Sequence, residues 1–129
     1  MSQFQLFQIP SEQSTFSTKE VMKITGFTKE ALRYYEKLAI LGPIVRNQTN
    51  YRQYNTVNLQ RLQMVKVFQY LGMDLSMLKD LSETDSLEKH LEVLRSYQAT
   101  VHEQMSQLQE IDHFIENKID YLINNHSKN

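Results

Sequence analysis

The sequence contains no cysteine, and this absence excludes several kinds of chemistry at once. Without a thiol there is no disulfide, no thiolate metal ligand, no cysteine nucleophile and no thiol-based redox sensor. Glycine and proline are scarce as well, with 3 and 2 among 129 residues, so few positions interrupt a helix. The composition therefore favours a protein with long helices.

Long apolar runs and catalytic motifs are also missing. No segment approaches the ~20 apolar residues that cross a bilayer, and no signal peptide pattern precedes the domain. The sequence has no glycine-rich phosphate loop, no nucleophile and base motif and no catalytic metal spacing. We therefore expect a cytoplasmic protein that is not an enzyme, with no membrane partner, no catalytic residues and no cofactor.

Charge is distributed unevenly along the chain, although the formal net charge is only −1. Residues 17–66 contain nine Lys or Arg against three Glu, for a net charge of +6. Residues 67–129 contain five basic and eleven acidic residues, for a net charge of −6, and Glu12 supplies the remaining charge. A basic first half indicates a polyanionic partner for that half.

The stretch from Thr28 to Tyr54, TKEALRYYEKLAILGPIVRNQTNYRQY, combines these features. Thr28 can cap a short helix that carries the motif RYYE, and Gly42-Pro43 ends it. Two short strands follow, Ile44-Val45 and residues 51–54, joined by a loop over 47–50 in which Asn50 tolerates a left-handed conformation best. A helix and a ribbon that both carry cations and aromatics suit a nucleic-acid backbone.

Further helices flank this stretch. Ser17 and Glu20 form a capping box that starts a helix ending at Gly26, the residue expected in the turn of a helix-turn-helix. Asn55 or Thr56 caps a third helix, which reaches Leu71 before Gly72. Asp74 then caps a short fourth helix.

From Ser86 to Asn124 the apolar residues repeat in steps of three and four, as in a coiled coil. Such a helix would be roughly 58 Å long. Its narrow seam needs a partner, most simply a second copy of the chain, although folding back on its own domain is the alternative. Gln98 and Asp112 interrupt the seam. The nine apolar positions, which we predict to mediate dimerisation, are Leu87, Leu91, Leu94, Val101, Met105, Leu108, Ile115, Ile119 and Leu122.

Three segments of the chain resemble the DNA-binding domain of the MerR family of bacterial transcription regulators. They are KEVMKITGFTKEALRYYEKLAIL, NYRQY and LQRLQMVKVFQYLGMDLSMLKDL, and together they cover about half of the chain. Residues 86–124 are similar to the family's dimerisation helix. The chain departs from the family at Ala39 and Asn50, where glycine is usual. Both substitutions affect fine geometry and remove neither a cation nor an aromatic residue.

The resemblance implies a mainly α-helical winged helix-turn-helix dimer that binds a pseudo-palindromic operator in a promoter. In the family, the promoter has an overlong spacer between its two recognition elements. An effector makes the bound dimer distort this spacer, which realigns the two elements for RNA polymerase. The helix after Thr28 would enter the major groove and the hairpin would lie on the flanking backbone. The predicted DNA-binding residues are Thr28, Lys29, Glu30, Arg33, Tyr34, Lys37, Tyr51, Arg52 and Lys66, and Arg61 adds charge nearby.

Four segments are therefore predicted. They are an N-terminal arm of no fixed place (1–16), a winged helix-turn-helix domain (17–84), an antiparallel coiled-coil helix (85–124) and a tail (125–129). Two alternatives remain, namely a coiled-coil module that binds an acidic protein and a repressor that needs no effector. Glu110, His113 and Glu116 lie one helical turn apart, but such residues on an acidic helix usually form a solvated face, so we predict no metal site. The effector stays open.

Overall fold

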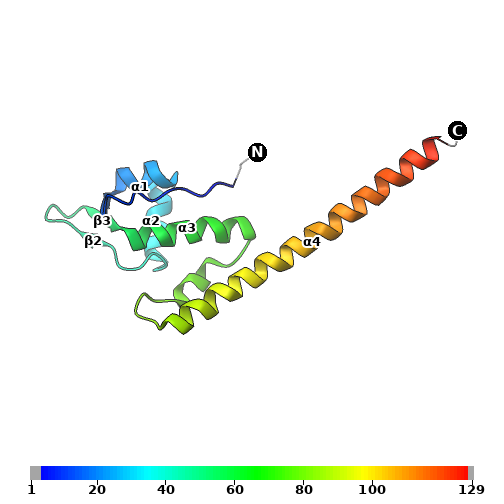
Figure 1. Cartoon of the computed structure of the whole chain (residues 1–129). Helices are drawn as coiled ribbons and strands as arrows, with labels where there is room; N and C mark the ends of the chain where they lie inside the picture. Colours follow the sequence, from blue (N-terminus) through cyan, green and yellow to red (C-terminus); the bar gives the residue numbers. More distant parts are fainter. Residues whose placement is uncertain (1–3, 128–129) are drawn as a thin grey trace. The chain divides into compact units, whose positions relative to one another are not determined.

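The computed structural model describes residues 4–127 (Figure 1), so residues 1–3 of the predicted arm and 128–129 of the predicted tail lie outside that range. The chain divides into two compact units, residues 1–84 and 85–129. The predicted mainly helical fold is confirmed. Its elements in order are β1 (Thr15–Ser17), α1 (Thr18–Thr25), α2 (Lys29–Lys37), β2 (Val45–Arg46), β3 (Arg52–Asn55), α3 (Thr56–Leu71), the 3-10 helix η1 (Leu75–Asp80) and α4 (Leu87–Ser127).

The predicted helix starts at Ser17, Thr28 and Asn55 are present, but α2 ends at Lys37 and not at Gly42-Pro43 as predicted, because the chain already turns at Ala39. The Ser17 hydroxyl accepts from the Glu20 amide at 3.1 Å, and the Glu20 carboxylate accepts from the Ser17 amide at 2.9 Å. That second bond lowers the pKa of Glu20 below its ordinary value. Asn55 caps α3 in the same reciprocal way with Asn58. Gly26 ends α1 at a φ of 79°, a left-handed conformation that costs most other residues about 1 kcal/mol or more.

The sheet has three strands in the order β1-β3-β2, both pairs antiparallel, so β3 lies at its centre. The sequence predicts only the last two strands. Phe16 of β1 lies opposite Tyr54 of β3, and both side chains are fully buried. The sequence does not predict β1, because a three-residue strand with one buried side chain is too short to show an alternation of polar and apolar residues. The capping box that follows it indicates only the start of a helix.

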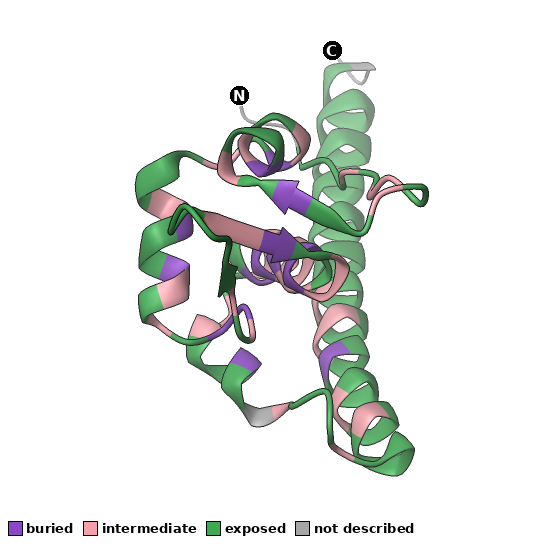
Figure 2. Cartoon of the chain, turned by 90° about the vertical axis from the view of Figure 1, so that its left-hand side faces the viewer, coloured by how far each residue is buried: buried purple, intermediate pink, exposed green. Residues whose placement is uncertain are grey.

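One apolar core joins the sheet to the helices of the first unit, and Figure 2 shows its buried residues on the inner sides of those elements. α1 supplies Val21, α2 supplies Leu32 and Tyr35, and the turn after α2 supplies Ile40 and Leu41. α3 contributes one long buried stripe, made of Leu59, Leu62, Val65 and Phe68. This core holds α2 with its opposite face toward solvent.

The predicted short fourth helix is present after α3, and it is a 3-10 helix. Asp74 accepts from the Ser76 amide at 3.0 Å as predicted, but η1 has only six residues. Arg61 of α3 holds its far end, because its guanidinium donates to the carbonyls of Leu78, at 2.6 Å, and Leu81. Arg61 therefore connects α3 to η1 within the fold, and its added charge near DNA stays a prediction.

Burial of the Tyr54 ring raises the pKa of its phenol above 10.0. Its hydroxyl is buried and, among the described residues, makes no hydrogen bond of normal geometry, although the nearby Thr18 side chain opposes part of this rise in pKa. The folded state therefore keeps a proton that the unfolded chain loses near pH 10. Stability from this group is complete below pH 10 and is lost as the pH rises above it.

We expect Tyr54→Phe to leave the free energy of unfolding at pH 7 within about 1 kcal/mol of wild type, since an unpaired hydroxyl is lost. Between pH 9 and 11 the variant should lose less stability than wild type, as measured by urea denaturation at each pH. Tyr51→Phe, which removes a hydroxyl from an exposed ring, is the matched control. Equal slopes for wild type and Tyr54→Phe would contradict the expectation.

Candidate nucleic-acid interface

Helix α2 presents one polar, basic face to solvent. Thr28 starts it by accepting from the Ala31 amide at 3.1 Å. With Leu32 and Tyr35 buried, 3.6-residue periodicity turns five side chains outward. These five are all exposed and all belong to the predicted DNA-binding set, namely Lys29, Glu30, Arg33, Tyr34 and Lys37.

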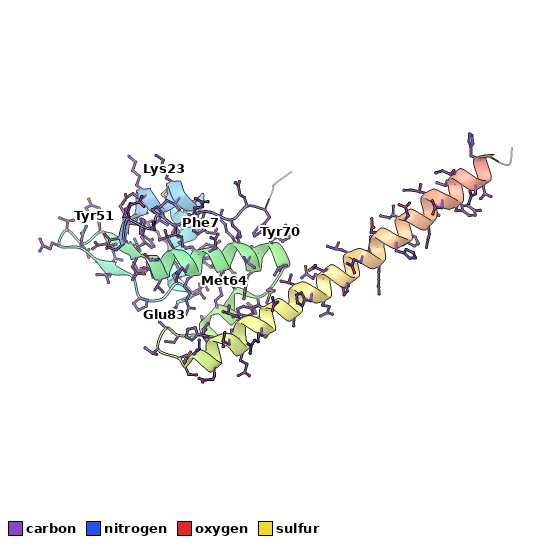
Figure 3. The ribbon with its side chains drawn as sticks, in the orientation of Figure 1. Phe7, Lys23, Tyr51, Met64, Tyr70 and Glu83 are labelled. Atoms are coloured by element: carbon purple, nitrogen blue, oxygen red, sulfur yellow. The ribbon has the colours of Figure 1, made fainter. Side chains whose placement is uncertain are left out.

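The hairpin between β2 and β3 is locked at its tip by one side chain. The Asn47 carboxamide oxygen accepts from the amides of Thr49 and Tyr51, both at 3.0 Å, and from the Thr49 hydroxyl at 2.8 Å. Asn50 has a φ of 66°, as its residue type predicts. Tyr51 projects from the tip with 71% of its surface exposed (Figure 3). A tip held this firmly can present Tyr51 without further ordering.

An ion pair connects this hairpin to α2. The Arg52 Nε atom lies 2.7 Å from the Glu36 Oε1 atom, and both side chains are mostly buried, with 21% and 28% exposed. Glu36 therefore pairs with Arg52 and not with its helical neighbour Arg33. Arg52 is the first residue of β3, directly after the tip, so the pair fixes the tip end of the hairpin against the helix. Its role in contacting DNA stays a prediction.

A cavity of about 320 Å³ lies between α1, α2 and the hairpin. We call it the basic cleft, because five cationic side chains line it and no carboxylate does: Lys19, Lys29, Arg33, Arg46 and Arg52. Thr18, Met22, Asn50 and Tyr51 complete its walls. Cations gathered in a concave surface focus a positive potential and suit a phosphate chain.

Two of the five cations, Lys19 and Arg46, are absent from the predicted site. A signal for Lys19 existed, because the capping box places it in the first turn of α1, the helix that precedes the turn at Gly26. Arg46 ends β2, and its Nη1 atom donates to the Asn50 carbonyl at 3.2 Å. Its position depends on the hairpin register, which pairs it with Arg52. That register is not readable from a two-residue strand.

Lys66, the last predicted DNA-binding residue, lies elsewhere. Its ammonium stands 5.7 Å from the ring centroid of Phe7 and 5.2 Å from that of Phe27. The side chain is half-buried on α3 and is not among the residues that line the basic cleft. The structure thus gives Lys66 two aromatic contacts inside the protein, and its contact with DNA stays a prediction.

Helix α4 forms the second unit and has 41 residues, beginning one residue later and ending three residues later than predicted. Of the nine predicted dimerisation residues, Val101 is half-buried and the other eight are exposed. Every described side chain from Met105 to His126 is exposed (Figure 2). Ile111, Phe114, Tyr121 and Ile123 widen the exposed apolar surface beyond the predicted seam.

Two further features are absent from the described residues, 4–127. Within that range no three His, Cys, Asp or Glu side chains are grouped so as to hold a metal ion. No helix in the same range combines the length and apolar character needed to cross a membrane.

The chain is similar to known helix-turn-helix transcriptional regulators. Residues 16–84 match the family described as MerR HTH family regulatory protein. The HTH-type transcriptional regulator ZntR homolog of Haemophilus influenzae is 32% identical over 93 residues, which are 70% of this chain and 69% of that protein. The multidrug-efflux transporter 2 regulator of Bacillus subtilis is 23% identical over 81% of this chain, but the match spans only 38% of that regulator.

Among solved structures, the crystal structure of HiNmlR has a similar fold, with a TM-score of 0.68 at 24% identity. The match covers 81% of this chain and 87% of that one. HiNmlR is a MerR family regulator that lacks the sensor domain, and its structure was determined bound to promoter DNA. The curated relatives above are regulators and not enzymes.

Proposed function

Because this chain belongs to the MerR family of helix-turn-helix regulatory proteins, we propose that it regulates transcription by binding a promoter operator as a dimer. The basic cleft is the observation that carries the proposal. Five cations from three separate segments line it, of which Arg52 is paired with Glu36 outside the lining, next to an exposed helix face and an exposed hairpin tip. HiNmlR, which shares the fold, was crystallised on promoter DNA.

In this proposal α2 enters the major groove and the hairpin lies on the adjoining backbone. Lys29 and Glu30 stand in the first turn of α2, where side chains can reach base edges. Arg33, one turn later, grips a phosphate or a guanine with its planar fork. Tyr34 and Tyr51, both exposed, donate their hydroxyls to phosphates.

A second copy of the chain supplies the other half of the operator. The seam from Leu87 to Leu122 pairs antiparallel with its equivalent, so that two α2 helices face one pseudo-palindrome. We further propose that the dimer acts in the cytoplasm and distorts the promoter spacer in response to a stress or small-molecule signal, which aligns the promoter for RNA polymerase.

Anisotropy-monitored binding to duplexes tiled across the DNA upstream of the protein's own gene tests the proposal. We expect tight binding to one palindromic tile and weak binding to its scrambled control. Raising the salt should weaken binding steeply, with a log–log slope of about −0.9 for each phosphate contact. Equal, weak binding to every tile would contradict sequence-specific regulation and would favour the coiled-coil module instead.

Arg33→Ala should weaken operator binding by roughly 10- to 100-fold, the size of one good charged contact to a base edge. A phosphate contact would instead weaken all tiles alike and reduce the salt slope by about one. The same anisotropy assay at two salt concentrations separates these cases.

Arg95→Ala is the matched control, since Arg95 is an exposed arginine on α4, outside the basic cleft. It should bind the operator as wild type does. If Arg33→Ala also bound as wild type, the assignment of Arg33 to the interface would be wrong.

A further inference from the structure

The N-terminal arm, residues 4–14, is held on α3, although the sequence leaves it without a fixed place. The Gln63 carboxamide bonds to the arm twice, accepting from the Phe7 amide at 3.1 Å and donating to the Phe7 carbonyl at 2.7 Å. One side chain thus satisfies both backbone groups of one arm residue, as a neighbouring strand would. The family match covers residues 16–84, so Gln63 lies within it and the arm residue Phe7 lies outside it.

Aromatic contacts reinforce the two hydrogen bonds. The Phe4 ring lies 4.7 Å from the Tyr70 ring, centroid to centroid, and the Lys66 ammonium lies over the Phe7 ring. Phe7 and Tyr70 both lie along α3 in Figure 3. Phe4 and Leu6 nevertheless keep 43% and 54% of their surface exposed. The arm is therefore specifically held but buries little apolar surface, which is typical of a segment that opens locally.

The arm continues directly into the wall of the basic cleft. Gln13 donates to the Thr15 carbonyl at 2.8 Å and to the Glu20 carboxylate at 2.9 Å. Thr15 begins β1, and Glu20 belongs to the capping box that starts α1. Lys19 directly precedes Glu20 in the first turn of α1, and its side chain lines the cleft. Two anchored points of the arm, Phe7 on Gln63 and Gln13 on Glu20, are thus joined by the intervening chain, and Glu20 is the sequence neighbour of a cation of the cleft.

We propose that the arm is a latch, and that Gln63 is a positioning residue for DNA binding. The docked arm holds β1 and the first turn of α1 so that Lys19 stays in the basic cleft. Release of the arm loosens this turn and weakens the grip on DNA. This inference rests on the proposed function, because the cleft is taken to be the DNA-binding surface.

Gln63→Ala in the full chain tests the latch, since alanine keeps α3 intact and removes both bonds to Phe7. Amide exchange measured in residues 4–8 should accelerate roughly tenfold, as expected for two lost hydrogen bonds, and residues 15–20 should also exchange faster. Gln63→Glu keeps the acceptor for the Phe7 amide and should restore part of the protection. Gln60→Ala, at an exposed position of α3, should change nothing.

DNA affinity then separates positioning from a general loss of stability. Gln63→Ala should raise the dissociation constant for the operator roughly fivefold, the lower end of couplings between distinct sites. In a Lys19→Ala background the same change should have no further effect, because the arm acts through Lys19.

Each outcome decides the inference. An equal loss of affinity in both backgrounds would overturn it, as would unchanged affinity or unchanged exchange in residues 4–8. If the wild-type chain bound no duplex, the proposed function would fail by itself. The latch would then be judged by exchange alone, supported if residues 15–20 open together with residues 4–8 and overturned if they do not.

Discussion

Asn58→Asp is expected to reduce the free energy of unfolding by about 3 kcal/mol or more, although it exchanges only one amide nitrogen for an oxygen. Asn58 is 1% exposed. Its Nδ2 atom donates to the carbonyls of Leu41, at 2.7 Å, and Pro43, at 3.1 Å. An ionised carboxylate there would face two carbonyl oxygens with no proton to offer, and a protonated one could donate to only one of them.

The effect reaches the interface because Asn58 supports the turn that follows α2. This turn contains two left-handed residues, Ala39 with a φ of 59° and Gly42 with a φ of 79°. Ala39 adopts its conformation at a cost of roughly 1 kcal/mol, so the turn depends on bonds from outside itself. Asn58 supplies two such bonds from α3, and in this way fixes the end of α2 against the core.

Asn55→Asp is the matched control, because Asn55 caps α3 from an exposed position and aspartate caps a helix equally well. Its unfolding free energy should stay within about 0.5 kcal/mol of wild type. Urea denaturation at one fixed protein concentration measures both variants. A loss below about 1 kcal/mol for Asn58→Asp would show that the two carbonyls do not depend on Asn58.

Acid should partly rescue Asn58→Asp, which distinguishes a buried charge from a packing defect. Burial would raise the folded-state pKa of the new carboxyl above its unfolded value of about 3.9. A group whose pKa is raised on folding contributes stability below the unfolded pKa and loses it as the pH rises. The deficit relative to wild type should therefore shrink as the pH falls toward 4.

The features that the sequence predicts correctly are those decided within a few residues. The capping box at Ser17, the cap at Thr28 and the left-handed Asn50 each depend on neighbours at most four positions away. Helical periodicity likewise selects the exposed face of α2, because it follows from which residues must be buried. For this reason the sequence alone identifies the part of the candidate interface that α2 contributes.

The features that it misses depend on contacts between distant segments. Arg61 and Lys66 are cations on a helix face, but each long side chain reaches a partner elsewhere, the η1 carbonyls for one and two aromatic rings for the other. The contact of Gln63 with Phe7 spans 56 residues. Lys19 and Arg46 meet in one cleft only through the folded hairpin and α1. No local pattern encodes these distances.

A single substitution in the apolar seam of α4 is expected to have a larger effect on function than a single substitution elsewhere in the chain. A 41-residue helix is about 60 Å long, and over its second half every described side chain up to His126 is exposed. Leu108, Ile115, Ile119 and Leu122 lie on one stripe, each with 44% or more of its surface exposed. Burying that stripe against a second copy removes this apolar area from water.

Ile115→Asp should therefore separate the proposed dimer, since each copy would bring one unpaired carboxylate into a dry seam at a cost of several kcal/mol. We expect the dimer dissociation constant, measured by sedimentation equilibrium, to rise at least about 100-fold. Binding to the full palindrome should fall toward that of a half-site, because two linked domains no longer engage one duplex. Half-site binding itself should change little, since α2 and the basic cleft lie in the other unit.

Gln109→Asp places the same group on the polar side of the same helix and should remain dimeric. If wild type were itself a monomer at micromolar concentration, α4 would not pair with a second copy, and folding back on its own domain would become the better description. If Ile115→Asp stayed dimeric with wild-type affinity, the dimer would exist but its seam would lie elsewhere on α4. The wider stripe of Ile111, Phe114 and Tyr121 would then be the surface to test next.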